Sequence, residues 1–340
     1  MFRDYLRQIV EGRNLDQNQM GRMIDEILSG NVTDAQVGAF MAALATKGET
    51  FEELAGAARA MRRKAQRIQV TAPVVVDTCG TGGDGLATFN ISTTTAFVVA
   101  GAGITVAKHG NRSVSSKSGS ADVLESLGVN LSTPPEIVEE AVAEIGIGFL
   151  FAPLYHSAMR HAGRARQEVG LRSIFNMLGP LTNPAGANCQ LLGVYAPQLT
   201  EMFAEALKLL GTRRALVVHG HDGLDEISVC AATRVSEIND GRVHTYDIQP
   251  EKYFGRLAEP ADLTGGDPQQ NADITRSVLS GQSGPCRDVV LINAAAALMA
   301  AGKVDDFDGG IEQAKLAIDS GGAMAKLDAL VEFTTANTQP

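Results

Sequence analysis

The sequence lacks several features that would place the chain in other classes of protein. It has no tryptophan, and its 4 cysteines lie far apart with no C-x-x-C pair, which argues against a zinc site and a disulfide framework. No apolar run approaches the length of a membrane-spanning helix, and the charged residues within residues 1–20 leave no room for a signal-peptide core. We therefore expect reduced thiols, no membrane partner and a cytoplasmic location.

Positive charge is also in short supply. The chain has 29 Lys and Arg against 39 Asp and Glu, a net charge of −10. This balance disfavours duplex DNA, so we expect no nucleic-acid partner, and any polyanionic ligand must meet a local basic cluster. With 340 residues, 44% of them hydrophobic, the chain otherwise has the composition of a globular protein of about two domains.

The first part of the chain reads as a set of short helices. Three apolar patterns at helical spacing each follow a residue that can cap a helix. These caps are Asp16, Thr33 and Thr50, the last two at capping-box spacing from Gln36 and Glu53. Because such side chains satisfy free backbone amides at a helix start, we predict a small helical domain over residues 1–70.

Beyond this region, β-branched runs alternate with helical patterns. Five runs read as buried strands, at residues 74–76, 104–107, 147–152, 215–220 and 288–295. This alternation predicts a larger α/β domain over residues 71–340, with a central and mostly parallel sheet. The Arg-rich stretch 155–185 contains no strand pattern, and part of it is expected to fold back onto the helical domain.

One of the intervening helices has a recognisable start. Pro134 suits the first position of a helix, where its missing N–H costs nothing. Thr133 and Glu136 have capping-box spacing, so we predict that a helix begins here.

The segment after the first predicted strand is the most informative. Residues 80–90, here called the glycine loop, carry glycines at 80, 82, 83 and 85 and run into an apolar helix. Glycines let a backbone approach a ligand closely, and the free amides of a helix start attract anions. The spacing is neither a Walker loop nor a G-x-G-x-x-G motif. We interpret the loop as a phosphate or pyrophosphate site, and the alternative is an ordinary tight turn.

A basic loop, residues 108–120, follows the second predicted strand. Its sequence K-H-G-N-R-S-V-S-S-K-S-G-S combines positive charge with hydroxyl and amide groups, and Val114 is its single large apolar residue. In an acidic chain this is the basic cluster that a polyanion needs. The alternative is a solvated loop without a function.

Two adjacent carboxylates, Asp225 and Glu226, follow another predicted strand. Mg²⁺ commonly binds one or two carboxylates together with substrate phosphates, and the Ser92 hydroxyl could add a ligand. A surface turn is the alternative interpretation. His219 and His221 have no further ligand at metal-binding spacing, so we interpret them as structural.

Residues 158–172 contain several arginines that could clamp a carboxylate in a bidentate manner. They are Arg160, Arg164, Arg166 and Arg172. Ion pairing with Glu168 on the helix surface is the alternative, and composition alone does not choose which arginine binds a ligand.

These motifs, in this order, closely resemble those of the anthranilate phosphoribosyltransferases, which are nucleoside-phosphorylase-like phosphoribosyltransferases. The matching strings are D-T-C-G-T-G-G-D, F-N-I-S-T, K-H-G-N-R-S-V-S-S-K-S-G-S-A-D-V-L-E-S-L-G-V, F-N-M-L-G-P-L-T-N-P and G-L-D-E-I-S. The resemblance implies a magnesium-dependent glycosyltransferase of tryptophan biosynthesis. Such an enzyme moves the phosphoribosyl group of phosphoribosyl pyrophosphate (PRPP) onto the amine of anthranilate.

The resemblance also implies roles for individual residues and a homodimer assembled through the helical domain. The residues that would hold PRPP are Gly80, Gly83, Asp84, Thr88, Asn90, Ile91, Ser92, Thr93, Lys108, His109, Gly110, Asn111, Arg112, Ser113, Val114, Ser115, Ser116 and Ser120. Those that would contact anthranilate are Gly80, Asn111 and Arg166, and the catalytic residues would be Lys108 and Arg166. Two magnesium ions per monomer would be held by Ser92, Asp225 and Glu226.

Two other functions fit the same motifs less well. A pyrimidine nucleoside phosphorylase of this fold also needs a glycine loop, but its substrate carries one phosphate, which makes the acidic pair less necessary. A catalytically silent nucleotide-sensing protein would keep the loops for binding alone. Turnover that depends on both Mg²⁺ and PRPP separates these functions from the transferase.

Overall fold

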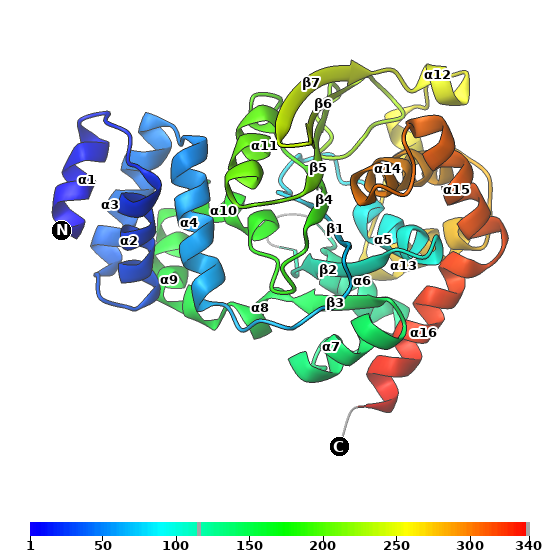
Figure 1. Cartoon of the computed structure of the whole chain (residues 1–340), viewed down its shortest axis with the longest axis horizontal. Coiled ribbons are helices and arrows are strands. Elements are labelled where there is room, and N and C mark those ends of the chain that lie inside the picture. The colour runs from blue at the N-terminus through cyan, green and yellow to red at the C-terminus, as the bar shows by residue number, and fades with distance from the viewer. Residues whose placement is uncertain (114–116, 338–340) are drawn as a thin grey trace.

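The computed structural model describes residues 1–113 and 117–337. Helices gather at the N-terminal end of the molecule, and a sheet flanked by helices makes up the larger remainder (Figure 1). Val114, Ser115 and Ser116, three of the residues predicted to hold PRPP, lie outside the described residues. Within the described ranges, no helix is both long and apolar enough to cross a membrane.

The N-terminal helices begin at the predicted caps. They are α1 (Phe2–Val10), α2 (Gln17–Leu28), α3 (Asp34–Lys47) and α4 (Phe51–Lys64). Asp16 accepts hydrogen bonds from two amides of α2, and Thr33 and Thr50 form the predicted capping boxes. Glu53 is fully buried and also accepts from the Leu15 amide and from Lys47, so one carboxylate ties α4 to the end of α3 and to the segment before α2.

The Arg-rich stretch returns to these helices. It contains α8 (Ala152–Tyr155), the 3-10 helix η1 (Ser157–Met159), α9 (Arg160–Val169), α10 (Ile174–Leu178) and the 3-10 helix η2 (Gly179–Leu181). As predicted, it contains no strand between residues 155 and 185, all of which are described. α9 packs on α2 and α3, and α10 packs on α3 and α4 (Figure 1). The arginines of α9 are therefore carried by the helical part of the molecule.

Seven strands form one sheet in the described chain. They are β1 (Val75–Gly80), β2 (Thr105–Gly110), β3 (Ile147–Phe151), β4 (Cys189–Gly193), β5 (Arg214–Gly220), β6 (Thr233–Asn239) and β7 (Arg242–Ile248). Their order is β3-β2-β1-β4-β5-β6-β7. The first five strands in this order pair in parallel, and β6 pairs antiparallel with both β5 and β7. The prediction of a mostly parallel sheet is confirmed, and four of the five predicted strands are β1, β2, β3 and β5.

The fifth predicted strand, residues 288–295, is wrong because this run lies within the helix α14 (Pro285–Ala301). Every residue from Val289 to Ala301 is buried, since α14 packs against the sheet on one side and other helices on the other. A helix enclosed in this way has no polar face, so periodicity cannot distinguish it from a buried strand. Its length of 17 residues and the proline at its start are the features that identify it.

The predicted helix start at Thr133 is also wrong in detail. The helix α7 (Pro135–Glu144) begins one residue later than predicted, so Pro135 and not Pro134 takes its first position. The Thr133 hydroxyl donates to the Asn130 carbonyl at 2.7 Å instead of capping the helix. A short polar side chain can satisfy a nearby backbone group in place of a cap, and spacing alone does not show which it does.

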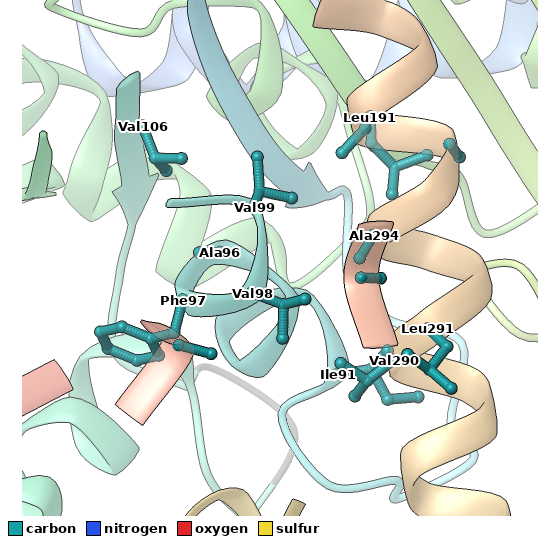
Figure 2. Packing of buried hydrophobic residues seen from close by; sticks show 14 of the residues in the cluster. Ile91, Ala96, Phe97, Val98, Val99, Val106, Leu191, Val290, Leu291 and Ala294 are labelled. Carbon is teal, nitrogen blue, oxygen red and sulfur yellow. The ribbon is translucent and has the colours of Figure 1, made fainter. Parts of the chain in front are cut away.

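Helices cover both faces of the sheet. The remaining helices are α5 (Ile91–Gly101), α6 (Ser120–Leu127), α11 (Leu199–Leu209), α12 (Glu251–Phe254), η3 (Pro260–Leu263), α13 (Pro268–Leu279), α15 (Phe307–Asp319) and α16 (Gly322–Ala336). On one face, Figure 2 shows Val98 and Val99 of α5 near Leu191 of β4 and Leu291 of α14. On the other face, the cluster beneath α11 continues into the N-terminal helices.

Candidate active site

The strand order creates a topological switch beside β1. From β1 the chain moves outward through β2 and β3 and then returns to the other side of β1 as β4. In open α/β sheets, ligands bind outside the carboxyl ends of the strands at such a point. Gly80 ends β1 and Gly193 ends β4, and the two residues are register partners. The glycine loop therefore leaves the sheet where a ligand is expected.

The glycine loop has a backbone that most side chains resist. Gly82, Gly83 and Gly85 have φ values of +66°, +82° and +78°, in the left-handed region that favours glycine. At Gly80 the requirement is space, because a Cβ atom there would lie 2.6 Å from Asp225 Oδ2. These glycines are required by the loop and are not incidental.

Three hydrogen bonds from separate segments hold the first part of the glycine loop. They join the Thr81 amide to the Gly193 carbonyl at 2.9 Å, the Gly82 amide to Asp225 Oδ2 at 2.8 Å, and Arg172 Nη2 to the Gly83 carbonyl at 2.9 Å. The position of the loop is thus set by β4, by the acidic pair and by the segment after α9.

The start of α5 remains uncapped. Its N-cap residue, Asn90, makes no side-chain bond to the helix. Instead the Asn90 amide group bonds Ser118 and accepts from Asn271 Nδ2 at 2.9 Å. Two of the first amides of α5 have other partners, because the Ile91 N–H bonds the Phe89 carbonyl at 2.8 Å and the Ser92 N–H bonds Glu226. Because Ser118 belongs to the basic loop, Asn90 joins the two predicted loops.

Lys108 provides a buried cation at the base of this site. It lies near the carboxyl end of β2, and its ammonium group donates to the Thr78 carbonyl and to Ser92 Oγ at 3.3 Å. Burial lowers the pKa of Lys108, and the charge of Asp77 opposes that shift. One positive charge therefore sits between the glycine loop and the start of α5.

Other residues of the basic loop are bonded to its own neighbours. Gly110 ends β2, and the Ser120 hydroxyl at the start of α6 donates to the Asn111 carbonyl at 3.3 Å. The Arg112 guanidinium pairs with Asp122 and Glu125, both at 2.9 Å, and the Ser113 amide donates to Asp122. Arg112 would have to leave these carboxylates to meet PRPP.

Several residues predicted to hold PRPP have side chains that are buried or already bonded to other parts of the chain, so those that contact PRPP would do so through their backbone. Ile91 and Thr93 are 2% and 1% exposed, so their side chains belong to the core. Thr88 forms a bridge with Thr264. His109 is buried, and its Nδ1 bonds the Gly179 carbonyl at 3.2 Å.

The acidic pair lies beneath the glycine loop, and the surface-turn alternative does not hold. Glu226 is 7% exposed, and Asp225 binds the loop at Gly82. Burial and the nearby charge of Asp84 raise the pKa of Asp225 to about 7. Burial and the charge of Asp225 raise the pKa of Glu226, an effect that Lys108 opposes. These carboxylates gather with too little positive charge to balance them.

This arrangement fits a divalent cation that arrives with its substrate. Among the described residues, no group of three or more His, Cys, Asp or Glu side chains could hold a metal by itself. Asp225 and Glu226 would therefore supply part of a coordination shell, which Mg²⁺ completes with water and phosphate oxygens. The Ser92 hydroxyl, in contact with Lys108, lies in the same site.

The two nearby histidines have structural partners. The buried His219 ring bonds the Val194 carbonyl at 2.7 Å and so links β5 to the end of β4. His221 pairs with Asp247 at 3.4 Å. Both contacts agree with the structural interpretation.

The arginines of residues 158–172 differ in their contacts. Arg164 pairs with Glu168 at 2.9 Å, as the ion-pair alternative supposed. Arg166 is half-buried, and its Cζ lies 5.7 Å from the centroid of the Phe175 ring. Burial lowers the pKa of Arg166, and none of the described residues forms an ion pair or hydrogen bond with its guanidinium. Arg166 is thus available to bind an acid.

Two buried polar residues that support the site were missed by the sequence analysis. Asn293 of α14 accepts from the Ile227 amide at 3.0 Å and donates to the Ile227 carbonyl at 2.9 Å. Asp77 accepts from the His109 amide and from Asn183 Nδ2, at 3.1 and 2.8 Å. A polar side chain within an apolar run is costly to bury without partners, and that cost was the available signal.

Comparisons with known proteins agree with this architecture. A model described as a glycosyl transferase family, helical bundle domain, matches residues 3–65, and one described as a glycosyl transferase family, a/b domain, matches residues 72–324. The anthranilate phosphoribosyltransferase of Desulfosudis oleivorans is 69% identical over 338 residues, covering 99% of this chain and 100% of that protein. That of Syntrophobacter fumaroxidans is 68% identical over 337 residues, with the same coverage.

Solved structures give the same result. The crystal structure of anthranilate phosphoribosyltransferase from Thermus thermophilus matches with a TM-score of 0.92 and 42% identity, covering 97% of this chain and 99% of that one. The enzyme from Saccharomyces cerevisiae in complex with PRPP and Mg matches with a TM-score of 0.90 and 29% identity, covering 98% of each chain. The chain belongs to the anthranilate phosphoribosyltransferase family.

Proposed function

We propose that the chain transfers the phosphoribosyl group of PRPP to the amine of anthranilate, giving N-(5-phosphoribosyl)anthranilate and pyrophosphate. The observation that carries this proposal is the meeting of the glycine loop, the buried acidic pair and Lys108 at the switch point of the sheet. The pyrophosphate group of PRPP is a ligand that suits backbone amides and a buried cation. Relatives with this name match the chain along its whole length.

The bond changes need few protein groups. The C1–O bond to pyrophosphate breaks, the nitrogen lone pair of anthranilate forms the new C1–N bond, and the nitrogen then loses a proton to water. An arylamine is neutral at pH 7, so no protein base has to activate it. Catalysis is then a matter of positioning the two substrates and stabilising charge.

Two basic residues carry the catalytic roles in this proposal. Lys108, with the amides of the glycine loop that have no partner among the described residues, stabilises the negative charge that grows on the departing pyrophosphate. Arg166 binds the anthranilate carboxylate, for which its fork of donors is suited, and so orients the amine. Gly80 and Asn111 complete the anthranilate site.

The PRPP contacts predicted from the resemblance are retained in this proposal. Gly83, Asp84 and Asn90 would bind through the loop, and Ile91 and Thr93 through their backbone, because their side chains are buried. The hydroxyls and amides of the basic loop would bind the remaining phosphate and ribose oxygens.

We also propose that Ser92, Asp225 and Glu226 hold Mg²⁺, with two ions per monomer. The raised pKa of Asp225 and the burial of Glu226 support this, because a divalent cation would balance their charge. When bound, the metal neutralises charge on the leaving pyrophosphate. Titration with Mn²⁺ in the presence of PRPP, followed by electron paramagnetic resonance, counts the ions, and a count of one would contradict the proposed number.

The organisation of the whole molecule is a further part of the proposal. Residues 1–70, with part of 155–185, would form one domain and residues 71–340 the other, with a homodimer assembled through the helical domain and a cytoplasmic location. The packing of α9 on α2 and α3 supports this division. Sedimentation of the intact protein tests the dimer, and a monomer at micromolar concentration would contradict it.

Loss of anthranilate fluorescence on addition of PRPP and Mg²⁺ tests the proposed reaction. We expect a loss that disappears when PRPP is omitted or EDTA is added. Retained fluorescence, with PRPP still bound, would point to a relative with another acceptor or to a silent binding protein.

A further inference from the structure

Arg172 links the helical part of the molecule to the glycine loop. It lies in the turn between α9 and α10, six residues after Arg166. Its guanidinium stacks on the Tyr195 ring, with Cζ 3.8 Å from the ring centroid, and Nη2 donates to the Gly83 carbonyl at 2.9 Å. Among the described residues, no carboxylate pairs with Arg172. Its partners are therefore an aromatic face and one backbone carbonyl of the loop.

Glycine at position 83 suits both the backbone and the arginine. The φ of +82° lies in the left-handed region that favours glycine. A Cβ atom at this position would displace the end of the Arg172 side chain, so the missing side chain also lets the guanidinium lie against the loop.

The aromatic platform is also tied to the loop. The Tyr195 amide donates to Thr81 Oγ1 at 3.2 Å, two residues before Gly83. Tyr195 lies two residues after the end of β4, and the intervening Val194 amide bonds the Val218 carbonyl of β5 at 2.9 Å, so the residue that supports Arg172 is held beside the sheet. Arg172 and Tyr195 therefore contact each other, and each is also hydrogen-bonded to the glycine loop.

The bond to Arg172 fixes the direction of an amide in the site. A trans peptide unit is planar, so the Gly83 carbonyl and the Asp84 N–H point in opposite directions. The described residues offer the Asp84 N–H no hydrogen-bond partner. When Arg172 holds the carbonyl, this free donor keeps one orientation within the loop predicted to bind PRPP.

We propose that Arg172 is a positioning residue for PRPP, which orients the Gly83–Asp84 peptide of the glycine loop from the segment between α9 and α10. This inference rests on the proposed function and extends it to a residue that does not need to touch either substrate. A guanidinium on an aromatic face combines a cation–π contact with a charged hydrogen bond, so both are lost together when the arginine is replaced.

The test compares variants of Arg172 and Tyr195 in steady-state kinetics and in calorimetry with PRPP and Mg²⁺ alone. For Arg172→Met, which keeps much of the side-chain length, we expect the KM and Kd of PRPP to rise about tenfold, the size of losing one charged hydrogen bond. The anthranilate KM should stay within about twofold, since Arg166 is untouched. Arg172→Lys keeps a cation and a donor, and should recover most of the PRPP affinity.

Tyr195 provides the second arm of the test. Tyr195→Phe keeps the ring face and should behave as the unaltered protein, whereas Tyr195→Leu should weaken PRPP binding several-fold. Because the two residues act together, the double variant Arg172→Met with Tyr195→Leu should be little worse than Arg172→Met alone. Arg63→Met is the matched control, because it removes an exposed arginine of α4 that is ion-paired with Asp25 of α2. This variant should change neither substrate's KM.

The outcomes separate this inference from the proposed function. If the unaltered protein does not transfer the phosphoribosyl group, the proposed function is contradicted, while calorimetry with PRPP still tests the role of Arg172. If transfer occurs but Arg172→Met leaves the KM and Kd of PRPP unchanged, or raises both substrates' KM equally, Arg172 does not position PRPP. A rise in the anthranilate KM alone would instead assign Arg172 to the acceptor.

Discussion

Replacing Asn293 of α14 with leucine should show how much its hydrogen bonds to Ile227 contribute to the stability of the folded protein. Asn293 is fully buried, and its side chain satisfies both the amide and the carbonyl of Ile227, the residue after Glu226. Its third bond, to the Val289 carbonyl, matters less because that carbonyl is also an acceptor within the helix. Leucine has a similar volume, so the substitution removes hydrogen bonds with little change in packing.

The expected loss follows from the two backbone groups left unpaired. Each buried, unsatisfied group costs about 1–3 kcal/mol, so the two groups left by Asn293→Leu should lower the free energy of unfolding by roughly 2–6 kcal/mol. Because Ile227 fixes the loop that carries Asp225 and Glu226, the KM of PRPP should also rise. Equilibrium urea unfolding measures the first effect and steady-state kinetics the second.

A matched control places the same substitution at the surface. Asn18 is exposed on α2, and Asn18→Leu should change the free energy of unfolding by about 0.5 kcal/mol or less. A loss below about 1 kcal/mol for Asn293→Leu would refute the reasoning, since it would mean that Ile227 finds other partners or that water reaches it.

Three further predictions concern the site itself. Arg166→Ala should raise the anthranilate KM by one to two orders of magnitude (roughly 1.5–3 kcal/mol) with little change in the PRPP KM, because a charged hydrogen bond to the acceptor carboxylate is lost; equal changes in both KM values in steady-state kinetics would remove Arg166 from the acceptor site. Asp225→Asn with Glu226→Gln should weaken metal-dependent PRPP use at least about tenfold, measured as the Mg²⁺ concentration for half-maximal rate, and an unchanged Mg²⁺ requirement would contradict the assignment. Without metal, the raised pKa of Asp225 means that the folded protein keeps this proton more tightly than the unfolded chain, so its contribution to stability is present near pH 4 and lost as pH rises through about 7. Thermal unfolding from pH 5 to 8 in EDTA should show this fall, and Asp225→Asn should flatten it; an identical slope in the variant would show that another group is responsible.

Local signals were the part of the fold that the sequence predicted well. The caps at Asp16, Thr33 and Thr50 depend on contacts within a few residues, and all three are confirmed. The glycine loop was predictable for the same reason, because positive φ values at Gly82 and Gly83 are a property of the residues themselves.

The hairpin of β6 and β7 was missed although its signal is present. Alternating residues flank Asp240 and Gly241, which have φ values of 49° and 73°, as expected for a tight hairpin turn with positive φ at both central positions. The strand β4 gave a weaker sequence signal, because its five residues are all buried and so show no alternation of apolar and polar side chains.

Features that depend on distant partners could not be predicted from the sequence. One example is which arginine can bind the substrate carboxylate. Arg164 is ion-paired with Glu168, and Arg172 contacts Gly83 and Tyr195, so Arg166 is left for this role. The helix α14 reads as a strand because it is enclosed on all sides by segments from elsewhere in the chain. The contact of Asp225 with the glycine loop likewise arises only once β1, β4 and β5 lie side by side.

The most direct test of the central claim is to identify the products formed from PRPP, Mg²⁺ and anthranilate by mass spectrometry, together with the pyrophosphate released. We predict one pyrophosphate for each anthranilate consumed, and a product with the mass of N-(5-phosphoribosyl)anthranilate. Pyrophosphate release with anthranilate unchanged, or no consumption of either substrate by a protein that binds PRPP, would contradict the proposed transfer.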